Sequence, residues 1–433
     1  MSRPRTTRPR TTRTPGPHRP FRPRVNARTA AVGALVLLLA AAPFVPRGDD
    51  EPDGALVPSG DGSPLAASAT AGAGRLTPEL AAEVDRVVAA GRAAGRVGPG
   101  AARRAPGAVA ADLVRCADLE GQRYCLGAGW TTATEDEVRA RVATAARTAT
   151  ARSRPVERTG DLDAAAALAR AASLSPAERA RREREELTMA ARSVAKVWLL
   201  RHEVEGVPLP AGFLEAHPEA RATVADAAAH TSARASTTAR KRQRDYPGRR
   251  VVLDPDQVAE QTRTYWCGPG AMQMIAWGWK GKDRGQAHWA DKLRTTTDGT
   301  SVWDMVRVVN DHTGWDRKAH AGPYVVLDIA DYSFNKWMLL QMRHLADYRA
   351  PVVLHPVLHR KYFPYLDDDA SGHFQVGRGY SKRGDRPSAI SFFEPWNQQR
   401  FDPSEPFIDR VQWRNAYKSY RANKAHFQHN IGV

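Results

Sequence analysis

The sequence predicts an α+β fold whose main core lies in the C-terminal part of a 433-residue chain. Nine of the eleven Trp and eight of the eleven Phe come after residue 260, and aromatic side chains dominate the area that a large core buries. Helical patterns follow residue 267 and strand patterns follow residue 351, which favours helices packed on an antiparallel sheet. The part before residue 240 is rich in Ala and Arg, has few aromatic residues, and is predicted to be mainly helical.

Composition divides the chain into five predicted segments. Low hydrophobicity with many Gly, Ala, Pro and Ser residues predicts disorder, and basic clusters predict linkers or targeting signals. The segments are a signal peptide or N-terminal anchor at 1–45, a low-complexity and largely disordered region at 46–110, a small hairpin with helices at 111–230, a basic linker at 231–250, and the core-bearing domain at 251–433.

The N-terminal segment has the basic-then-apolar order of a secretory signal. Residues 1–28 carry nine Arg and no acid, and Ala30–Val45 is a run of sixteen uncharged residues, short of the ~20 that a spanning helix needs. Ala40-Ala41-Ala42 offers a cleavage site, but Pro43 follows directly, so a cleaved signal and an uncleaved anchor both stay open. Either way, we expect the rest of the chain outside the membrane, which it contacts only through this segment.

The formal net charge of +17 does not predict nucleic-acid binding, because the excess is concentrated in two short clusters. The first is the targeting segment. The second, at 234–250, has seven basic residues and one acid, and neither cluster interleaves aromatic residues in a stacking pattern. We therefore expect no specific nucleic-acid partner.

Two of the three cysteines are placed to form a disulfide. Cys116 and Cys125 flank Glu120-Gly121, and a two-residue turn there would set the two cysteines opposite each other at a non-hydrogen-bonded pair of an antiparallel hairpin. Cα atoms at such a pair lie within ~4.5 Å, which a disulfide can span. Export favours the bond, and Cys267 is left unpaired.

Helices are predicted over 77–94, over 134–152, and from Ser175-Pro176-Ala177-Glu178, a capping box, to His202-Glu203. No catalytic constellation is visible in 111–230, and a propeptide-like regulatory segment, a wall-binding module and a spacer all remain open as its role. Arg240 to Arg244 would be an easy proteolysis site if exposed, so activation by cutting there is a hypothesis.

The C-terminal domain is predicted to alternate helices and strands in a fixed order. A helix follows Cys267. The other predicted elements are strands over 251–253, 324–329, 351–354, 374–380 and 389–393, and helices over 286–293, 301–311 and 333–348.

Cys267 is the strongest candidate for a catalytic residue. Gly268-Pro269 and an apolar run follow it, which predicts a helix whose first turn contains the thiol. A helix N-terminus offers unpaired N–H groups and the positive end of the macrodipole, and both favour the reactive thiolate. Gln261, six residues upstream, could return its amide to the sulfur as an oxyanion donor, and His373 lies on a strand-like segment much farther on.

These residues resemble the bacteriocin-processing (double-glycine) peptidase family, in its secreted stand-alone form. The likeness lies in Gln261-x5-Cys267-Gly268-Pro269, in Gly372-His373-Phe374 and in Glu394-Pro395, and it spans roughly 251–407. It implies a papain-like cysteine peptidase fold with Cys267 as nucleophile, His373 as general base and Gln261 as oxyanion donor.

The third catalytic position departs from that family. The resemblance puts Glu394 where the family has Asp, with Asn397 as a competing candidate, and Gly270 where a slightly larger Ala is usual. Glu is longer by one methylene group, so it would orient the imidazole less rigidly.

The sequence thus predicts an exported cysteine peptidase that acts on a peptide or protein and needs no metal or organic cofactor. His355 and His359 lie four apart, but Pro356 disfavours a helix there and no acid is spaced for zinc. Two alternatives stay open: a cell-wall peptide amidase or acyl transferase on the same fold, and a binding module with an inactive site.

Overall fold

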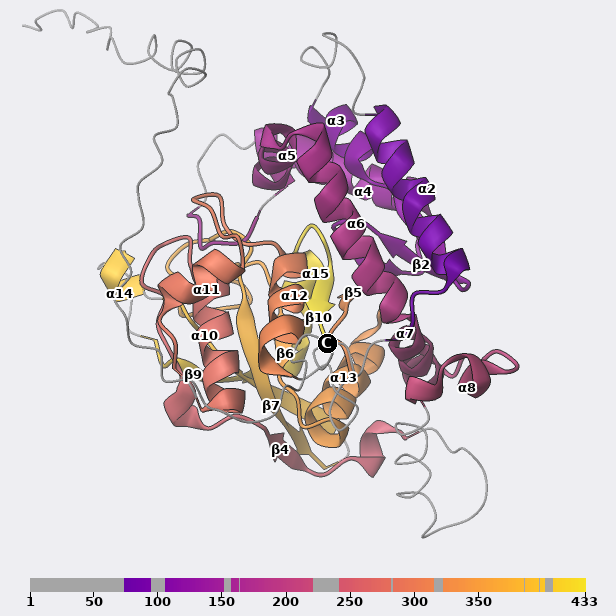
Figure 1. Ribbon diagram of the computed structural model, residues 1–433. Helices are drawn as coiled ribbons and strands as arrows, with labels where there is room; N and C mark the ends of the chain where they lie inside the picture. The colour runs from indigo at the N-terminus through magenta and orange to yellow at the C-terminus, as the bar shows by residue number, and fades with distance from the viewer. Residues whose placement is uncertain are drawn as a thin grey trace, which may run out of the picture. The chain divides into compact units, whose positions relative to one another are not determined.

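The computed structural model describes residues 74–94, 106–151, 157–162, 164–220, 241–281, 283–314, 322–384, 386–396, 398–401 and 408–433. All of them belong to one compact unit, Ser63–Val433 (Figure 1). The apolar run 30–45, the first residue of the proposed cut site, Arg240, and the alternative site residue Asn397 lie outside the described residues. No helix among those described is long and apolar enough to cross a bilayer.

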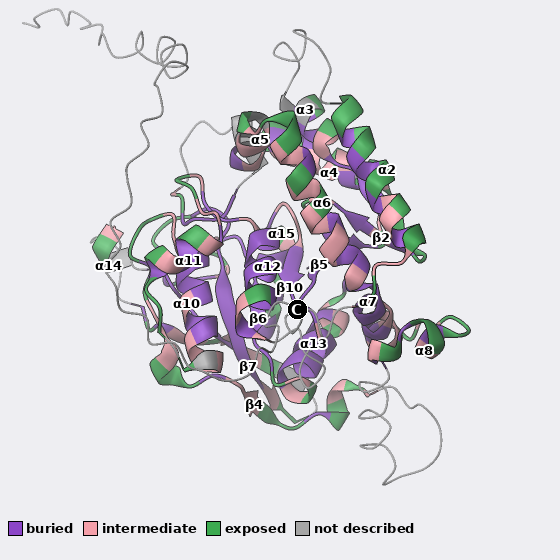
Figure 2. Ribbon diagram, in the orientation of Figure 1, coloured by how far each residue is buried: buried purple, intermediate pink, exposed green. Residues whose placement is uncertain are grey.

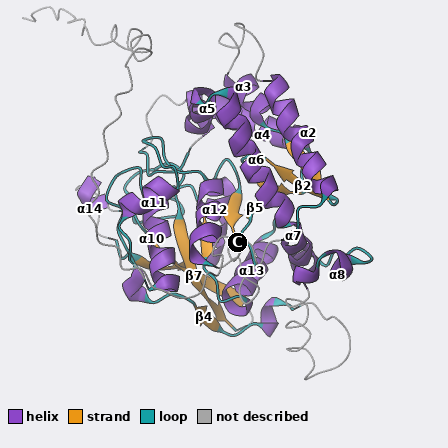
Figure 3. Ribbon diagram, in the orientation of Figure 1, coloured by secondary structure: helices purple, strands orange, loops and turns teal. Residues whose placement is uncertain are grey.

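Helices dominate the described part of the chain before residue 221, with one small group of strands (Figure 3). The elements are α2 (Pro78–Ala94), α3 (Pro106–Leu113), β1 (Cys116–Leu119), β2 (Gln122–Cys125), β3 (Gly129–Thr131), α4 (Glu135–Ala151), α5 (Ala164–Ser173), α6 (Pro176–Arg192), α7 (Val194–Leu200), the π-helical turn η2 (Arg201–Glu205), α8 (Phe213–Ala216) and the 3₁₀ turn η3 (Pro218–Ala220).

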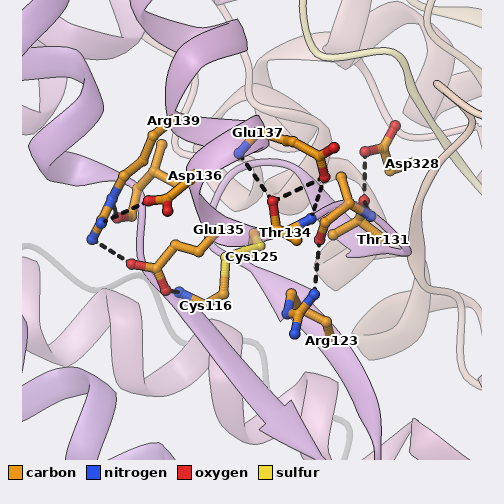
Figure 4. Close-up of a disulfide and its surroundings, with 12 residues drawn as sticks. Cys116, Arg123, Cys125, Thr131, Thr134, Glu135, Asp136, Glu137, Arg139 and Asp328 are labelled. Carbon is orange, nitrogen blue, oxygen red and sulfur yellow. Dashed lines mark hydrogen bonds and ion pairs between the residues drawn. A yellow bond between two sulfur atoms is a disulfide. The ribbon is translucent and has the colours of Figure 1, made fainter.

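The predicted hairpin and its disulfide are confirmed. Glu120 and Gly121 both have positive φ, 53° and 75°, which is the primed turn that matches the twist of antiparallel strands. The register pairs Cys116 with Cys125, and the two sulfurs are bonded (Figure 4). Glu135 at the start of α4 accepts the backbone N–H of Cys116 at 3.0 Å, which ties the hairpin to that helix.

The helix predicted from Ser175 begins as expected, because the Ser175 hydroxyl accepts the N–H of Glu178 at 3.1 Å. It does not run unbroken to residue 203. It ends at Ser193, whose hydroxyl and N–H both bond the carbonyl of Ala190, so α6 and α7 are separate helices. A serine that returns to its own backbone competes with the helical ladder, which explains the break.

Between residues 240 and 393 the helices and longer strands follow the predicted order, whereas the elements after residue 393 were not predicted. The elements after residue 240 are the 3₁₀ turns η4 (Gln243–Asp245) and η5 (Pro255–Gln257) on either side of β4 (Arg249–Val251), then α10 (Cys267–Lys280), α11 (Gln286–Lys292), α12 (Val302–Thr313), β5 (Val326–Asp328), α13 (Phe334–Met342) with the π-helical turn η6 (Arg343–Asp347), β6 (Val352–Leu354), β7 (Gln375–Arg383), β8 (Arg386–Phe393), α14 (Gln398–Phe401), β9 (Val411–Asn415), α15 (Ala416–Ala425) and β10 (Asn430–Gly432).

One sheet joins the two parts of the chain. Its order is β1-β2-β3-β5-β10-β6-β7-β8-β9, with β4 paired to β7. Neighbouring strands are antiparallel except β3 and β5, which pair in parallel through Trp130 and Leu327. The fold is therefore α+β, as predicted, and the hairpin region is built into the same sheet as the C-terminal strands.

The sheet separates two hydrophobic cores, because neighbouring strand residues point to opposite faces (Figure 2). Val352 and Leu354 belong to the core with α6, α7, α13 and α15, while Val353 between them belongs to the core with α10 and α12. Phe392 and Phe393 divide in the same way. Cys267 lies in the second core, at the N-terminus of α10.

The described part of the basic linker is folded. Lys241 contacts Asp347 at 2.7 Å, and Asp245 accepts the N–H of Arg242 at 2.7 Å around η4. Arg242 and Arg244 are nevertheless exposed, so the stretch is ordered but accessible. Activation by cutting within the linker stays a prediction.

Candidate active site

Cys267 is the first residue of α10, as its sequence context predicts. Trp266 precedes the helix without a side-chain cap, so the first-turn N–H groups have no capping side chain. Gly268 is required here, because a Cβ at that position would lie 2.5 Å from the Thr300 hydroxyl. The Cys267 side chain is completely buried.

The surroundings of the sulfur raise its pKa instead of lowering it. Burial is the largest cause, and the negative charges of Asp161 and Glu394 add to it, while the N–H groups of Phe374 and Gly268 act in the opposite direction. The expectation that the helix N-terminus would favour a thiolate is therefore wrong for this conformation. Desolvation and two carboxylates outweigh the helix dipole, so the group is a thiol.

The segment that carries His373 reaches Cys267, because the N–H of the next residue, Phe374, is directed at Cys267. The His373 Nε2 lies 2.6 Å from Glu394 Oε1, and Nδ1 has no hydrogen-bond partner among the described residues. A carboxylate only accepts, so Nε2 carries the proton and Nδ1 keeps a lone pair. The ring is thus set up to take a proton at Nδ1.

Glu394 is fixed by three donors besides His373. Tyr365 Oη and Gln375 Nε2 donate to its Oε2 at 2.7 and 2.6 Å, and the N–H of Trp396 donates to Oε1 at 3.0 Å. Burial alone would raise the pKa of this carboxyl, but the charge and hydrogen bond of His373, with Tyr365 and Trp396, lower it. The extra methylene of Glu therefore does not leave the carboxylate loose.

Gln261 lies at the same place, with its amide already engaged. Its backbone N–H donates to Pro395 O at 2.7 Å, next to Glu394. Its Nε2 donates to the carbonyls of Thr264 at 2.9 Å and Arg263 at 3.0 Å, and more weakly to that of Thr159 at 3.3 Å. The structure thus brings Gln261, Cys267, His373 and Glu394 together.

Gly270, the second departure from the resembled family, also has a local reason. A Cβ built there would lie 3.2 Å from Pro395 Cβ and 3.6 Å from Gln261 Cβ. The first of these contacts is tight, so α10 packs closely on the Gln261 and Pro395 segments because this residue lacks a side chain.

A segment from far upstream lies across these residues, and we call Glu157–Leu162 the strap. On one side, Ser371 N donates to Glu157 O at 2.9 Å and the Thr159 hydroxyl donates to Gly372 O at 2.7 Å. On the other side, Thr300 N donates to Gly160 O at 2.8 Å, and Leu162 N donates to Thr300 O at 3.2 Å. The strap bridges the segment before α12 and the segment that leads into His373.

The strap also delivers Asp161 to a second histidine network. Asp161 Oδ2 lies 2.7 Å from His426 Nε2, and its Oδ1 lies 2.8 Å from His355 Nε2. His355 Nδ1 lies 2.8 Å from Asn430 Oδ1, and the His355 ring stacks on Phe374 with centroids 4.5 Å apart. Burial would raise the pKa of Asp161, but the charges of the two histidines hold it well below its usual range.

Asp161, His355 and His426 are close enough together to hold a metal ion, and all three are buried. The proton position on His426 favours hydrogen bonding instead, whereas His355 Nε2 and Asp161 Oδ1 have no hydrogen-bond partner among the described residues. His426 Nδ1 accepts the N–H of Gln428 at 3.2 Å, so the ring proton sits on Nε2, which faces Asp161. A metal at Nε2 would need that proton moved to Nδ1, against the Gln428 N–H. We therefore treat the cluster as an anchor for the strap.

Sequence reasoning missed Asp161 and His426 and considered His355 only with His359. His359 instead contacts Asp369 at 3.0 Å. Asp161, His355 and His426 come from three separate segments, and no local spacing relates them. The glycine before His373 is a sequence feature related to this network. A side chain at Gly372 would clash with it, because a Cβ there would lie 2.2 Å from Asp161 Oδ2 and 2.4 Å from His426 Nε2.

Residues 255–424 match the Peptidase_C39 like family. The resemblance inferred from the sequence is thereby confirmed for this part of the chain, which is less than half of its 433 residues. The match indicates a cysteine-peptidase-like fold and peptide or protein substrates. No curated protein and no solved structure matches the chain. All four residues brought together at the site lie within the matched part.

Proposed function

We propose that this protein is an exported cysteine peptidase with a papain-like Cys–His–acid site. One observation carries the proposal. His373 holds its Nε2 on Glu394 at 2.6 Å and leaves Nδ1 without a partner among the described residues, and the next residue, Phe374, directs its N–H at Cys267, the first residue of a helix. Buried His344 also leaves one ring nitrogen without a partner, but its other nitrogen faces a backbone carbonyl, whereas His373 is held by a carboxylate.

The arrangement supports acyl transfer in two steps. His373 Nδ1 takes the proton of Cys267, and the sulfur attacks the substrate carbonyl carbon. The Cys267 N–H and the Gln261 amide stabilise the oxyanion, once Gln261 turns from the carbonyls that it now contacts. His373 then returns the proton to the leaving amine, and water enters by the same route to release the acid from the thioester.

Glu394 holds the imidazole in the required tautomer throughout. Its charge favours the imidazolium that forms after proton transfer, and its own three donors keep it in place. Tyr365, Gln375 and the Trp396 N–H are therefore positioning groups for the reaction.

The same thioester can react with water or with an amine, so the fold equally serves an amidase of cell-wall peptides or an acyl transferase. Product analysis with and without an added amine separates these reactions. The binding-module alternative keeps the fold without turnover, and the complete burial of Cys267 and His373 is the observation in its favour.

An electrophilic peptide probe tests the proposal on the full-length exported chain. We expect it to modify Cys267 in the wild type slowly, because the buried sulfur has to become exposed first, and not at all in Cys267→Ala. His373→Ala should slow the modification by about two orders of magnitude or more, and Gln261→Ala should lower peptide turnover by roughly two to three orders. Equal probe reactivity in the wild type and in His373→Ala would reject an activated thiol and favour the binding module.

A further inference from the structure

We propose that the strap, Glu157–Leu162, is a built-in inhibitor that occupies the substrate position at Cys267 and keeps the site latent. The inference rests on the proposed function, since it concerns regulation of the same site. It assigns one role to the region before residue 221, which the sequence alone leaves open.

The first step is that the strap backbone lies against the candidate catalytic residues. The Thr159 carbonyl accepts from Gln261 Nε2, the amide assigned to the oxyanion. Gly160 packs on the Tyr265–Cys267 backbone so closely that a Cβ on it would lie 2.5 Å from Tyr265 C and 2.9 Å from Cys267 N. A substrate carbonyl has to reach the same donors, so strap and substrate exclude each other.

The second step is that the strap is held from both sides and buried. Thr300 binds it on the side of α12, and Ser371 and Gly372 bind it on the side of His373. Thr159, Asp161 and Leu162 are at most 5% exposed, and Cys267, His373, Glu394 and Gln261 are not exposed at all. With the strap in place, a thiol reagent has no route to the sulfur.

The third step is that a dedicated anchor fixes the strap. Asp161 bonds or contacts His355 and His426, and Asn430 and Gln428 hold the far nitrogens of those two rings. Gly372 leaves room for the carboxylate. None of these contacts serves the proposed chemistry, whereas all of them restrain the one side chain that ties the strap down.

The geometry favours an inhibitor over a bound substrate. Gln261 gives its shorter hydrogen bonds to Thr264 and Arg263, so it does not clamp the Thr159 carbonyl. The thiol is kept protonated by burial and by the Asp161 carboxylate that the strap itself brings, because both raise the pKa of Cys267. The strap therefore blocks access and also makes the nucleophile less reactive.

The test measures access to Cys267 with iodoacetamide on the full-length protein. This reagent needs only an exposed thiol, and Cys267 is the one free cysteine, since Cys116 and Cys125 are bonded. Gly160→Ala places a methyl group against the Tyr265 and Cys267 backbone and should expel the strap. We expect labelling at least about tenfold faster than in the wild type.

Gly212→Ala is the matched control. Gly212 also has positive φ, 71°, but a Cβ there meets nothing within 4 Å. Gly212 therefore tests a methyl group at positive φ without a steric clash, at a milder φ than the 115° of Gly160, and the variant should label at the wild-type rate. If Gly160→Ala fails to fold, Thr159→Val decides, because it removes the hydroxyl bond to Gly372 O without adding volume. It should label about threefold faster than the wild type.

Three results would overturn the proposal that the strap is an inhibitor. The first is that folded Gly160→Ala or Thr159→Val labels no faster than the wild type. Rapid wild-type labelling would show that the sulfur is already open. A fragment ending at Thr159 that forms in the wild type and not in Cys267→Ala would make the strap a substrate. Rapid labelling of Gly160→Ala without hydrolysis of any peptide would instead support the strap and reject the peptidase.

Discussion

Two buried histidine–carboxylate networks lie on either side of Cys267, and they differ in how they use their ring nitrogens. His373 bonds Glu394 through Nε2 and leaves Nδ1 without a described partner. His426 uses both nitrogens, donating to Asp161 and accepting from Gln428. A ring with a spare lone pair can move a proton, whereas a ring with both positions filled can only hold its neighbour in place.

Three consecutive residues connect the networks. Gly372 makes room for Asp161 and His426, His373 bonds Glu394, and Phe374 stacks on His355 while its N–H points at Cys267. The comparison teaches that burial and a carboxylate partner do not identify a catalytic histidine. What sets His373 apart is a carboxylate on one ring nitrogen together with a lone pair on the other, since buried His344 also leaves Nδ1 unpartnered but faces a backbone carbonyl with Nε2.

The largest expected effect separates the two histidines. His373→Ala should lower peptide turnover by about three orders of magnitude or more, because it removes the proton acceptor. His426→Ala removes one anchor of Asp161, so it should speed iodoacetamide labelling of Cys267 and raise turnover. Initial rates of peptide turnover and rates of labelling, measured on folded protein, check the fall expected in His373→Ala and the rise expected in His426→Ala. A loss of turnover in both variants would erase the distinction.

Glu394 and Asp161 give the second contrast. Glu394→Gln keeps the size of the side chain but loses the charge that favours the imidazolium, so kcat should fall by roughly two to four orders with little change in KM. Asp161→Asn weakens the anchor and should raise kcat/KM. Steady-state kinetics on a peptide substrate distinguish them, and an active Glu394→Gln protein would remove Glu394 from the mechanism.

The pH dependence of labelling gives a third contrast. The raised pKa of Cys267 confines the wild-type reaction to alkaline pH, and losing the strap removes both burial and the Asp161 charge. The midpoint in Gly160→Ala should therefore lie at least about one pH unit lower. The same pKa shift affects stability. The folded state keeps the thiol proton to higher pH than the unfolded chain does, so the free energy of unfolding falls as pH rises past about 8.5, the pKa of the thiol in the unfolded chain. Melting curves of wild type and Cys267→Ser should diverge there.

The smallest expected effect concerns the donors to Glu394. Tyr365→Phe removes one hydrogen bond at 2.7 Å and leaves the Gln375 and Trp396 donors, so it should cost about 1 kcal/mol, or a few-fold in kcat. It should leave iodoacetamide labelling unchanged, because the hydroxyl that is removed bonds Glu394. A change in labelling without a change in kcat would show that Tyr365 acts on the Asp161 network and not on Glu394.

Local patterns in the sequence predicted much of this site. Glu120-Gly121 set the hairpin register and so the disulfide, and Gly268-Pro269 set the start of α10 at Cys267. The charge state of Cys267 was predicted wrongly, because the pKa depends on burial and on Asp161, which no local pattern brings near. The break of the helix at Ser193 was also missed. It has a local cause, because the Ser193 hydroxyl donates to the Ala190 carbonyl of its own helix.

By itself, the sequence determined where the chain turns, where its helices begin and which residues could do chemistry, since these depend on neighbours along the chain. Only the tertiary structure decided which histidine keeps a free nitrogen and what covers the thiol. Hydrogen-bond partners and desolvation come from segments far apart in sequence, and the sheet that brings the strap beside Cys267 is built from both parts of the chain.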